Sequence, residues 1–297
     1  MNLYKLVETV SNKKNFLDIS NYIDFGLSYL KFIKTDLQAV IVSRNENHYR
    51  FFQYKEDGTF NVTRAINSNL MLGLEEFEDG RKHFALLLRN IKDEGLDTEQ
   101  NRSLLNNFIY TTQQCIGATL DALPANKSNT ARKINGDLFE RFIRLIIAEV
   151  GVEVKEGVID VPVEIDGKVA FHMKYQHDLI IGVDSLPKAI GSVKTSSKDR
   201  LDKVFIDKFL YNRLTGTNTP HFAIFLNDVQ RKGREGKYGV SATFLPGHFR
   251  GYTVRLNPLD GVYYCDIRPN MLSEDILKDH IKTFDHFLFS DVWKFSE

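Results

Sequence analysis

The segment 189–210, AIGSVKTSSKDRLDKVFIDKFL, limits most strongly what this chain can fold into. Its first six residues form an apolar run that ends at Lys194, and its second half has the spacing of an amphipathic helix. Asp178, sixteen residues before Lys194, opens another apolar run, DLIIGV. This order predicts two buried strands followed by a helix, with Asp178 on one strand and Lys194 on the next.

The segments on either side extend this unit. A helix is predicted from Asn135, with Asn135 or Asp137 as its cap, and Glu140 lies on its first turn. Four short alternating stretches then read as strands: 152–154, 158–165, 168–173 and 177–183. After Lys194 we expect a helix at 201–214 and a strand at 221–226. The order predicts an α/β (α+β) fold with a mixed central sheet flanked by helices.

The N-terminal part has a different character. Helical periodicity is present at 16–34, 75–93 and 102–122. Strands are expected at 38–43 and 48–54, and the pair Asp57-Gly58 predicts a hairpin turn. The loop that begins at Pro124 is the best candidate boundary. We therefore expect a helix-rich α+β region at 1–124, with an accessory, dimerisation or DNA-contact role, and a site-bearing domain at 125–297.

Beyond residue 226 the patterns are weaker. The stretch VQRKGREGKYG places four basic residues among three glycines: Arg231, Lys232, Arg234 and Lys237. Such a loop can lie along a phosphate backbone, or it can be a disordered surface loop. A hairpin is expected from 251–256 and 262–266, and a closing amphipathic helix from 273–295.

Charge and composition restrict the class of protein. The net charge is zero, yet residues 187–255 carry 13 Lys or Arg against 5 Asp or Glu, which is typical of a local phosphate-contacting surface or of a solvated basic face. Two cysteines 150 positions apart form neither a disulfide framework nor a zinc knuckle. No apolar run approaches the length of a membrane span, and the N-terminus lacks a secretory signal. We expect a cytoplasmic protein without a membrane partner.

Four side chains are candidates for chemistry at one place. Asp178, Asp207 and Glu140 could hold one or two divalent ions, and Lys194 could orient an attacking water or neutralise a phosphate. This set is suited to in-line attack on phosphorus. In the alternative interpretation, Asp178 caps a strand, Lys194 lies on the surface, and Asp207 pairs with Lys203 or Lys208 along its helix.

The motifs around these residues resemble those of the PD-(D/E)XK nuclease superfamily, in the variant of type II restriction endonucleases that recognise CCGG or CCNGG. The family motif N-G-D-x-x-E is matched by Asn135, Gly136, Asp137 and Glu140. Asp178 matches the Asp of the central strand, and Ser192-Val193-Lys194 matches the S-V-K that replaces D/E-x-K. In this variant the second carboxylate comes from the following helix, about where Asp207 lies.

A further motif of the family, K-T-x-x-(R/K)-(D/E)-R, is matched by Lys194, Thr195, Lys198, Asp199 and Arg200. By this resemblance Lys198 and Arg200 donate to guanines, and Asp199 accepts from a cytosine amine, which are standard major-groove pairings. The resemblance covers about 70 to 80 residues. The chain departs from the family at His177, where Pro is frequent, and at Asp207, where Glu is usual and for which Asp202 is the fallback.

The resemblance implies a Mg²⁺-dependent enzyme that cuts palindromic double-stranded DNA and leaves 5′-phosphate ends with a 5′ overhang. It implies a homodimer or a tetramer in a prokaryotic cytoplasm, and a companion DNA methyltransferase that is not a stable partner. One alternative is a structure-directed or non-specific nuclease of the same superfamily, which would not read bases. The other is a catalytically inactive DNA-binding module.

Overall fold

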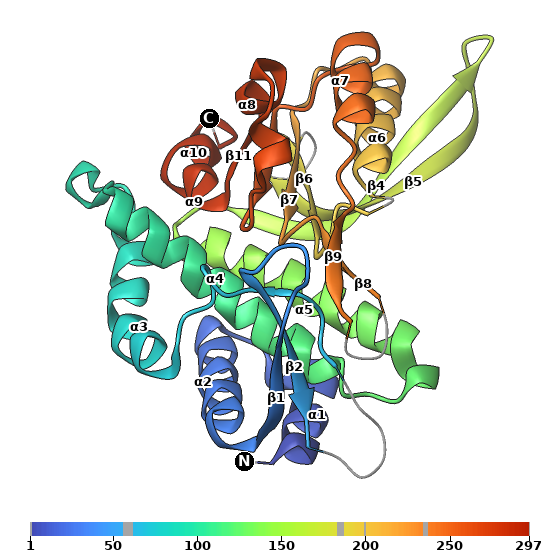
Figure 1. The fold of residues 1–297 in the computed structure, drawn as a ribbon. Coiled ribbons are helices and arrows are strands. Elements are labelled where there is room, and N and C mark those ends of the chain that lie inside the picture. Colours follow the sequence, from blue (N-terminus) through green and yellow to red (C-terminus); the bar gives the residue numbers. More distant parts are fainter. Residues whose placement is uncertain (1, 56–61, 183–186, 199, 234–236, 297) are drawn as a thin grey trace. The chain divides into compact units, whose positions relative to one another are not determined.

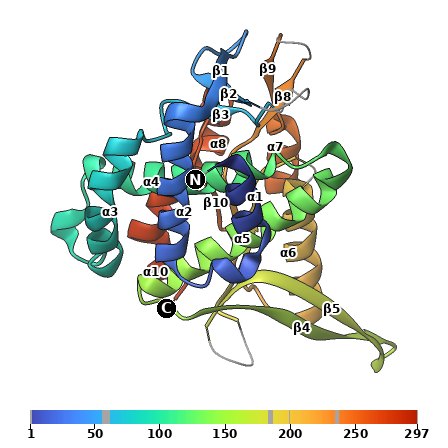
Figure 2. The same ribbon diagram turned by 90° about the horizontal axis from the view of Figure 1, so that it is seen from below.

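The computed structural model describes residues 2–55, 62–182, 187–198, 200–233 and 237–296 (Figures 1 and 2). The chain divides into two compact units. The first consists of Met1–Ile146 with Asp228–Thr243, and the second of Ile147–Asn227 with Phe244–Glu297. The predicted boundary between residues 124 and 125 therefore falls inside the first compact unit, and the functional division that it describes stays a prediction.

The helices of the first unit are α1 (Leu3–Ser11), α2 (Ile19–Asp36), α3 (Leu74–Arg89), α4 (Glu99–Leu120) and most of α5 (Ser128–Glu149). Helices α2, α3 and α4 follow the predicted periodicity, whereas α1 was not predicted. The predicted start of α5 at Asn135 is wrong, because this helix begins at Ser128. Asn135 is buried inside it and accepts hydrogen bonds from Nε2 of Gln113, 3.0 Å at Oδ1 and 3.2 Å at the backbone oxygen, so its polar groups stabilise packing rather than a helix end.

The strands of the first unit come from two distant parts of the chain. An antiparallel sheet joins β1 (Leu37–Val42), β2 (Tyr49–Tyr54) and β3 (Ile66–Asn67). The predicted turn at Asp57-Gly58 lies outside the described residues. The basic stretch after residue 228, interpreted as a loop, instead forms an antiparallel ribbon of β8 (Val229–Lys232) and β9 (Gly239–Ala242). The ribbon has structure because Val229 and Val240 are buried with Tyr49 and Phe51 in one cluster.

The second unit is built on a six-stranded sheet in the order β11-β10-β7-β6-β5-β4. Its strands are β4 (Val154–Ile165), β5 (Lys168–Ile181), β6 (Ala189–Lys194), β7 (His221–Phe225), β10 (Gly261–Tyr264) and β11 (Ile281–Thr283). The strand β5 is antiparallel to β4 and to β6, whereas β6, β7, β10 and β11 run parallel. The sheet is therefore mixed, as predicted.

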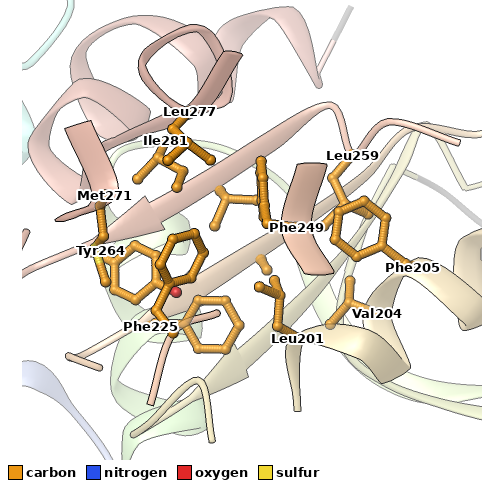
Figure 3. Packing of buried hydrophobic residues seen from close by; sticks show 13 residues of the cluster. Leu201, Val204, Phe205, Phe225, Phe249, Leu259, Tyr264, Met271, Leu277 and Ile281 are labelled. Atoms are coloured by element: carbon orange, nitrogen blue, oxygen red, sulfur yellow. The ribbon is translucent and has the colours of Figure 1, made fainter. Parts of the chain in front are cut away.

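Helices cover both faces of this sheet. On one face, α6 (Leu201–Thr215), α7 (Pro246–Arg255) and α8 (Asp275–His280) close a core that includes Phe205, Phe225, Phe249 and Tyr264 (Figure 3). On the opposite face, Phe222 of β7 packs on Phe287 and Phe295 of the C-terminal segment. The predicted fold class is confirmed. No helix in the described part of the chain has both the length and the apolar character that crossing a bilayer requires.

Two predicted elements near the C-terminus are wrong. The segment 251–256, expected as a strand, is instead the end of α7 and its cap Leu256, since Pro246 starts a helix whose buried Phe249 and Thr253 are four residues apart. Residues 273–295, expected as one helix, are interrupted by β11. This strand adds to the sheet beside β10, and the chain then continues as α9 (Phe284–His286), a π-helical turn at Phe287–Asp291 and α10 (Val292–Lys294).

Candidate active site

Asp178 and Lys194 lie side by side at the point where the ladder between β5 and β6 ends. The last antiparallel pair of that ladder is Leu179 with Gly191. Beyond it, Oδ2 of Asp178 accepts a hydrogen bond from the backbone N–H of Val193 at 2.8 Å and another from Nζ of Lys194. The carboxylate takes the place that a strand carbonyl would occupy, and this holds it against the lysine.

A β-bulge in β5 aims this carboxylate. Lys155 of β4 pairs with Ile180, and Gly157 pairs with His177, so Asp178 and Leu179 stand together opposite Glu156. The extra residue breaks the alternation of the strand and places His177 and Ile180 on the same face. Bulges of this kind commonly re-aim one side chain beside a functional site.

Asp178 and Lys194 are mostly buried, but part of each side chain remains accessible to solvent. The side chain of Asp178 is 14% exposed and that of Lys194 is 27% exposed. Attraction between opposite charges is stronger in such surroundings than in bulk water, while a substrate phosphate could still reach the lysine. Both hydrogen bonds fall on Oδ2, and no donor to Oδ1 occurs among the described residues.

Asp207 lies on α6 and forms an ion pair with Lys203, the pairing that the alternative interpretation expected. Burial raises the pKa of Tyr175, and the charge of Asp207 adds to that shift, so the influence of Asp207 reaches the sheet. Burial lowers the pKa of His177 below its ordinary value, and the charges of Asp207 and Asp178 both oppose that shift. The two carboxylates thus act on the same imidazole, although no direct contact between them is found among the described residues.

A cluster of aromatic and histidine side chains lies behind the carboxylates, and the sequence did not point to it. Tyr175 and His177 of β5 pack around Tyr211 of α6, and His221 of β7 contacts both His177 and Tyr211, with ring centroids 5.5–6.5 Å apart. The only local sign of this cluster in the sequence was the two-residue spacing of Tyr175 and His177, which places both side chains on one face of a strand. The other contacts depend on tertiary packing.

His221 should make the stability of the protein depend on pH. Its Nδ1 donates to the backbone oxygen of Thr219 at 2.9 Å, and its Nε2 is buried without a partner among the described residues. Burial lowers the pKa of His221 to about 4. The unfolded chain therefore takes up a proton below about pH 6.5 that the folded chain refuses, and the free energy of unfolding falls by about 3 kcal/mol between pH 6.5 and 4.

The variant His221→Asn tests this expectation, since an asparagine amide can still donate to Thr219 but does not titrate. Urea unfolding of both proteins across the pH range should show the difference in stability shrinking as the pH falls below 6.5. The remaining pH dependence of the variant is expected from His177, whose pKa is shifted in the same direction. Parallel stability curves for the two proteins would contradict the assignment.

The loop between β6 and α6 presents the residues predicted to read bases. The backbone N–H of Ser197 donates to the backbone oxygen of Asn227 at 3.3 Å, and that of Arg200 donates to the oxygen of Ser197 at 3.2 Å. Ser197 is buried, whereas Lys198 and Arg200 are exposed. The backbone of the loop is fixed to the end of β7 while these two side chains face solvent. Asp199 lies outside the described residues.

The remaining predicted residues lie elsewhere. Glu140 is half-buried on α5 in the first compact unit. Asp202, the fallback ligand, faces α7, where its Oδ2 lies 4.0 Å from Nδ1 of His248. Arg231 of the ribbon donates to the backbone oxygens of Val62 and Thr63, which commits much of its guanidinium to the protein. Lys232 and Lys237 are exposed, and Arg234 lies outside the described residues.

The donor set is compatible with a magnesium ion. No group of three or more metal-ligating side chains occurs in the described residues. However, Mg²⁺ is usually held by one or two carboxylates together with waters and substrate phosphates, not by a complete protein cage. In Asp178 one oxygen is committed to Lys194 and Val193, and the other has no donor in the described part of the chain, which fits that requirement.

Comparisons with known proteins place the fold. No protein-family model and no curated protein matches the chain. Among solved structures, it is similar to the type IIP restriction endonuclease Kpn2I, with a TM-score of 0.70 and 19% identity over 99% of this chain and 97% of that chain. It also aligns with PspGI in a complex with substrate DNA, with a TM-score of 0.44 and 14% identity over 75% of this chain and 90% of that chain. The likeness to Kpn2I shows that this chain has the fold of a restriction endonuclease along its whole length.

Proposed function

We propose that this protein is a type II restriction endonuclease that cuts palindromic double-stranded DNA with a CCGG or CCNGG core. The observation that carries the proposal is the contact between Asp178 and Lys194, where a carboxylate and a cation meet at the end of two adjacent strands. A bulge in β5 sets that geometry, on a fold shared along the whole chain with a restriction endonuclease.

In this proposal each side chain has a defined role in hydrolysis. Asp178 is the principal metal ligand, and Asp207 and Glu140 are supporting acids. A bound Mg²⁺ would lower the pKa of a water molecule and polarise the phosphate. Lys194 orients the attacking water or neutralises the charge that develops on the phosphate oxygens. Cleavage leaves 5′-phosphate ends and a 5′ overhang.

Recognition is assigned to the exposed side chains of the loop before α6. Lys198 and Arg200 would donate to guanines, and Asp199 would accept from a cytosine amine. Lys232, Lys237, Arg231 and Arg234 are proposed to contact the DNA backbone. A palindromic site requires two copies related by a two-fold axis, so the protein would act as a homodimer or a tetramer.

The exposure of Lys198 and Arg200 favours a sequence-specific enzyme over a structure-directed nuclease, which has no use for base-reading side chains on an anchored loop. The contact between Asp178 and Lys194 favours an enzyme over an inactive DNA-binding module, since binding alone does not require a carboxylate to be aimed by a bulge.

The proposal is tested by digesting phage DNA with the purified protein and Mg²⁺, then sequencing the fragment ends. The expected result is a set of discrete ends that share a CCGG or CCNGG core, and the bases around the core would give the full recognition site. Ends without a common sequence would point to a non-specific or structure-directed nuclease. Binding that depends on salt but produces no cutting would point to the inactive module.

A further inference from the structure

The hairpin of β4 and β5 extends well beyond the part of it that packs against other described residues of the chain. These strands have 12 and 14 residues, and in both views the tip of the hairpin projects away from the rest of the sheet (Figures 1 and 2). We refer to its outer part, residues 162–172, as the arm. The base of the hairpin packs on α6, because Val161 and Tyr175 lie in one buried cluster with Tyr211.

The apolar face of the hairpin continues past this cluster into the arm. Along β4, every second residue from Ile159 to Ile165 is Ile or Val. Val163 is paired with Phe171, beyond the buried Val161, and both have the side-chain direction of the covered residues. Yet Phe171 is 54% exposed and Ile165 is 58% exposed. The pattern is that of a buried face, and the described residues of this chain do not bury it.

The edge of the arm is protected against the addition of another strand. The strand β4 forms one edge of the sheet, and Pro162, which has no N–H to donate, lies in its exposed part. Of the arm's own residues, Glu164 and Asp166 are acidic and Lys168 is basic. The arm therefore lacks the basic character of a phosphate-contacting surface. Its exposed apolar face is suited instead to a protein partner that packs against it.

A surface of matching character is present on the same unit. Ile206 and Phe209 on the outer side of α6 are 50% and 43% exposed. Lys203, which is paired with Asp207, and Arg213 lie at the two ends of this stripe, at helical spacing, and both are exposed. An apolar stripe that ends in the basic Arg213 complements an apolar arm whose edge carries Glu164 and Asp166. Because one chain carries both surfaces, two copies can exchange them around a two-fold axis.

We propose that the arm of one copy packs on the outer stripe of α6 (Lys203, Ile206, Phe209 and Arg213) in a second copy, and that this contact joins the dimer. The inference goes beyond the proposed function, which calls for two copies on a palindrome but does not say which surfaces join them. In such a two-fold dimer the contact between arm and stripe occurs twice, so Phe171 and Phe209 each take part in two equivalent contacts.

Sedimentation of the full chain without DNA or Mg²⁺ tests the contact. The wild-type protein should be a dimer over a dilution series. Phe171→Glu should raise the dimer dissociation constant about a thousandfold. Loss of one central apolar residue typically raises a dissociation constant about 30-fold, and Phe171 occurs twice in the dimer. The matched control is His172→Glu, an exposed neighbour on the other face of β5, which should remain dimeric. A monomeric wild type, or a Phe171→Glu variant that dimerises as tightly as the control, would overturn the proposal.

A cross-linking experiment identifies the surface on which the arm packs. The native Cys115 and Cys265 are buried, so introduced cysteines would be the accessible thiols. Proteins carrying Phe171→Cys and Phe209→Cys should form a covalent dimer under oxidation only when they are mixed. Cross-linking of Phe171→Cys with itself, or none in the mixture, would rule out the stripe on α6. Digestion of DNA is a separate readout, so the dimer contact and the proposed activity can fail independently.

Discussion

Replacing Lys194 with alanine should lower the rate of DNA cleavage by about 100- to 1000-fold while leaving specific binding intact. The proposed role of Lys194 is to stabilise charge that develops in the transition state, and removing a single group of this kind typically costs 10²–10³ in rate. Asp178 would keep its hydrogen bond from the N–H of Val193, so the variant should fold normally. Single-turnover cleavage and a binding assay in Ca²⁺ would separate the two effects.

Lys188→Ala is the matched control for that experiment. Lys188 lies just before the other end of β6 and donates to the backbone oxygen of Ser296, so its loss removes one positive charge from the same strand region without touching Asp178. The control should cut at the wild-type rate. If the Lys194→Ala enzyme also cuts at a comparable rate, Lys194 has no role in the chemistry and the site must be sought elsewhere.

Replacing Arg200 with alanine should abolish discrimination at one base pair of each half-site. A bidentate contact between arginine and guanine is worth about 1–3 kcal/mol, so two half-sites lose about 2–6 kcal/mol of specific binding. Arg200→Lys keeps the charge but not the planar fork, and should be nearly as defective. Binding to a panel of sites with single base-pair changes would measure the loss position by position.

The control for Arg200 is Arg255→Ala, which removes an exposed arginine at the end of α7. Removal of a residue that contacts only phosphate should weaken binding to every sequence equally and reduce the salt dependence of binding. If Arg200→Ala behaves in that uniform way, its proposed role in reading a base is wrong, although the cleavage chemistry at Asp178 and Lys194 would be unaffected.

The juxtaposition of Asp178 and Lys194 could be predicted because it depends on strand adjacency. Two apolar runs joined by a short connection form neighbouring strands, and their spacing in the sequence brings the two side chains together. The bulge that aims Asp178 could not be predicted, since it is a mismatch between β5 and β4 and depends on the pairing of two strands. For the same reason the sequence did not reveal that His221 packs beside His177.

Elsewhere, local patterns failed where tertiary packing overrode them. Alternation at 251–256 resembles a strand, but Phe249 and Thr253 are buried on one side of a helix. The ribbon of β8 and β9 was hidden because the exposed residues of β8 are charged or polar, and burial is concentrated in Val229 and Val240. The helices α2, α3 and α4 were predictable because each is long and strongly periodic.

The ribbon also constrains the order in which the chain can fold. Tyr49 and Phe51 complete their cluster with Val229 and Val240, which follow almost two hundred residues later, and Asn45 binds the backbone of Val240 at both N–H and C=O. During synthesis the N-terminal residues leave the ribosome first. Their hydrophobic core is incomplete until residues 228–243 have also emerged. Contacts of such long sequence separation form late, so the first unit should be among the last parts of the molecule to reach its native packing.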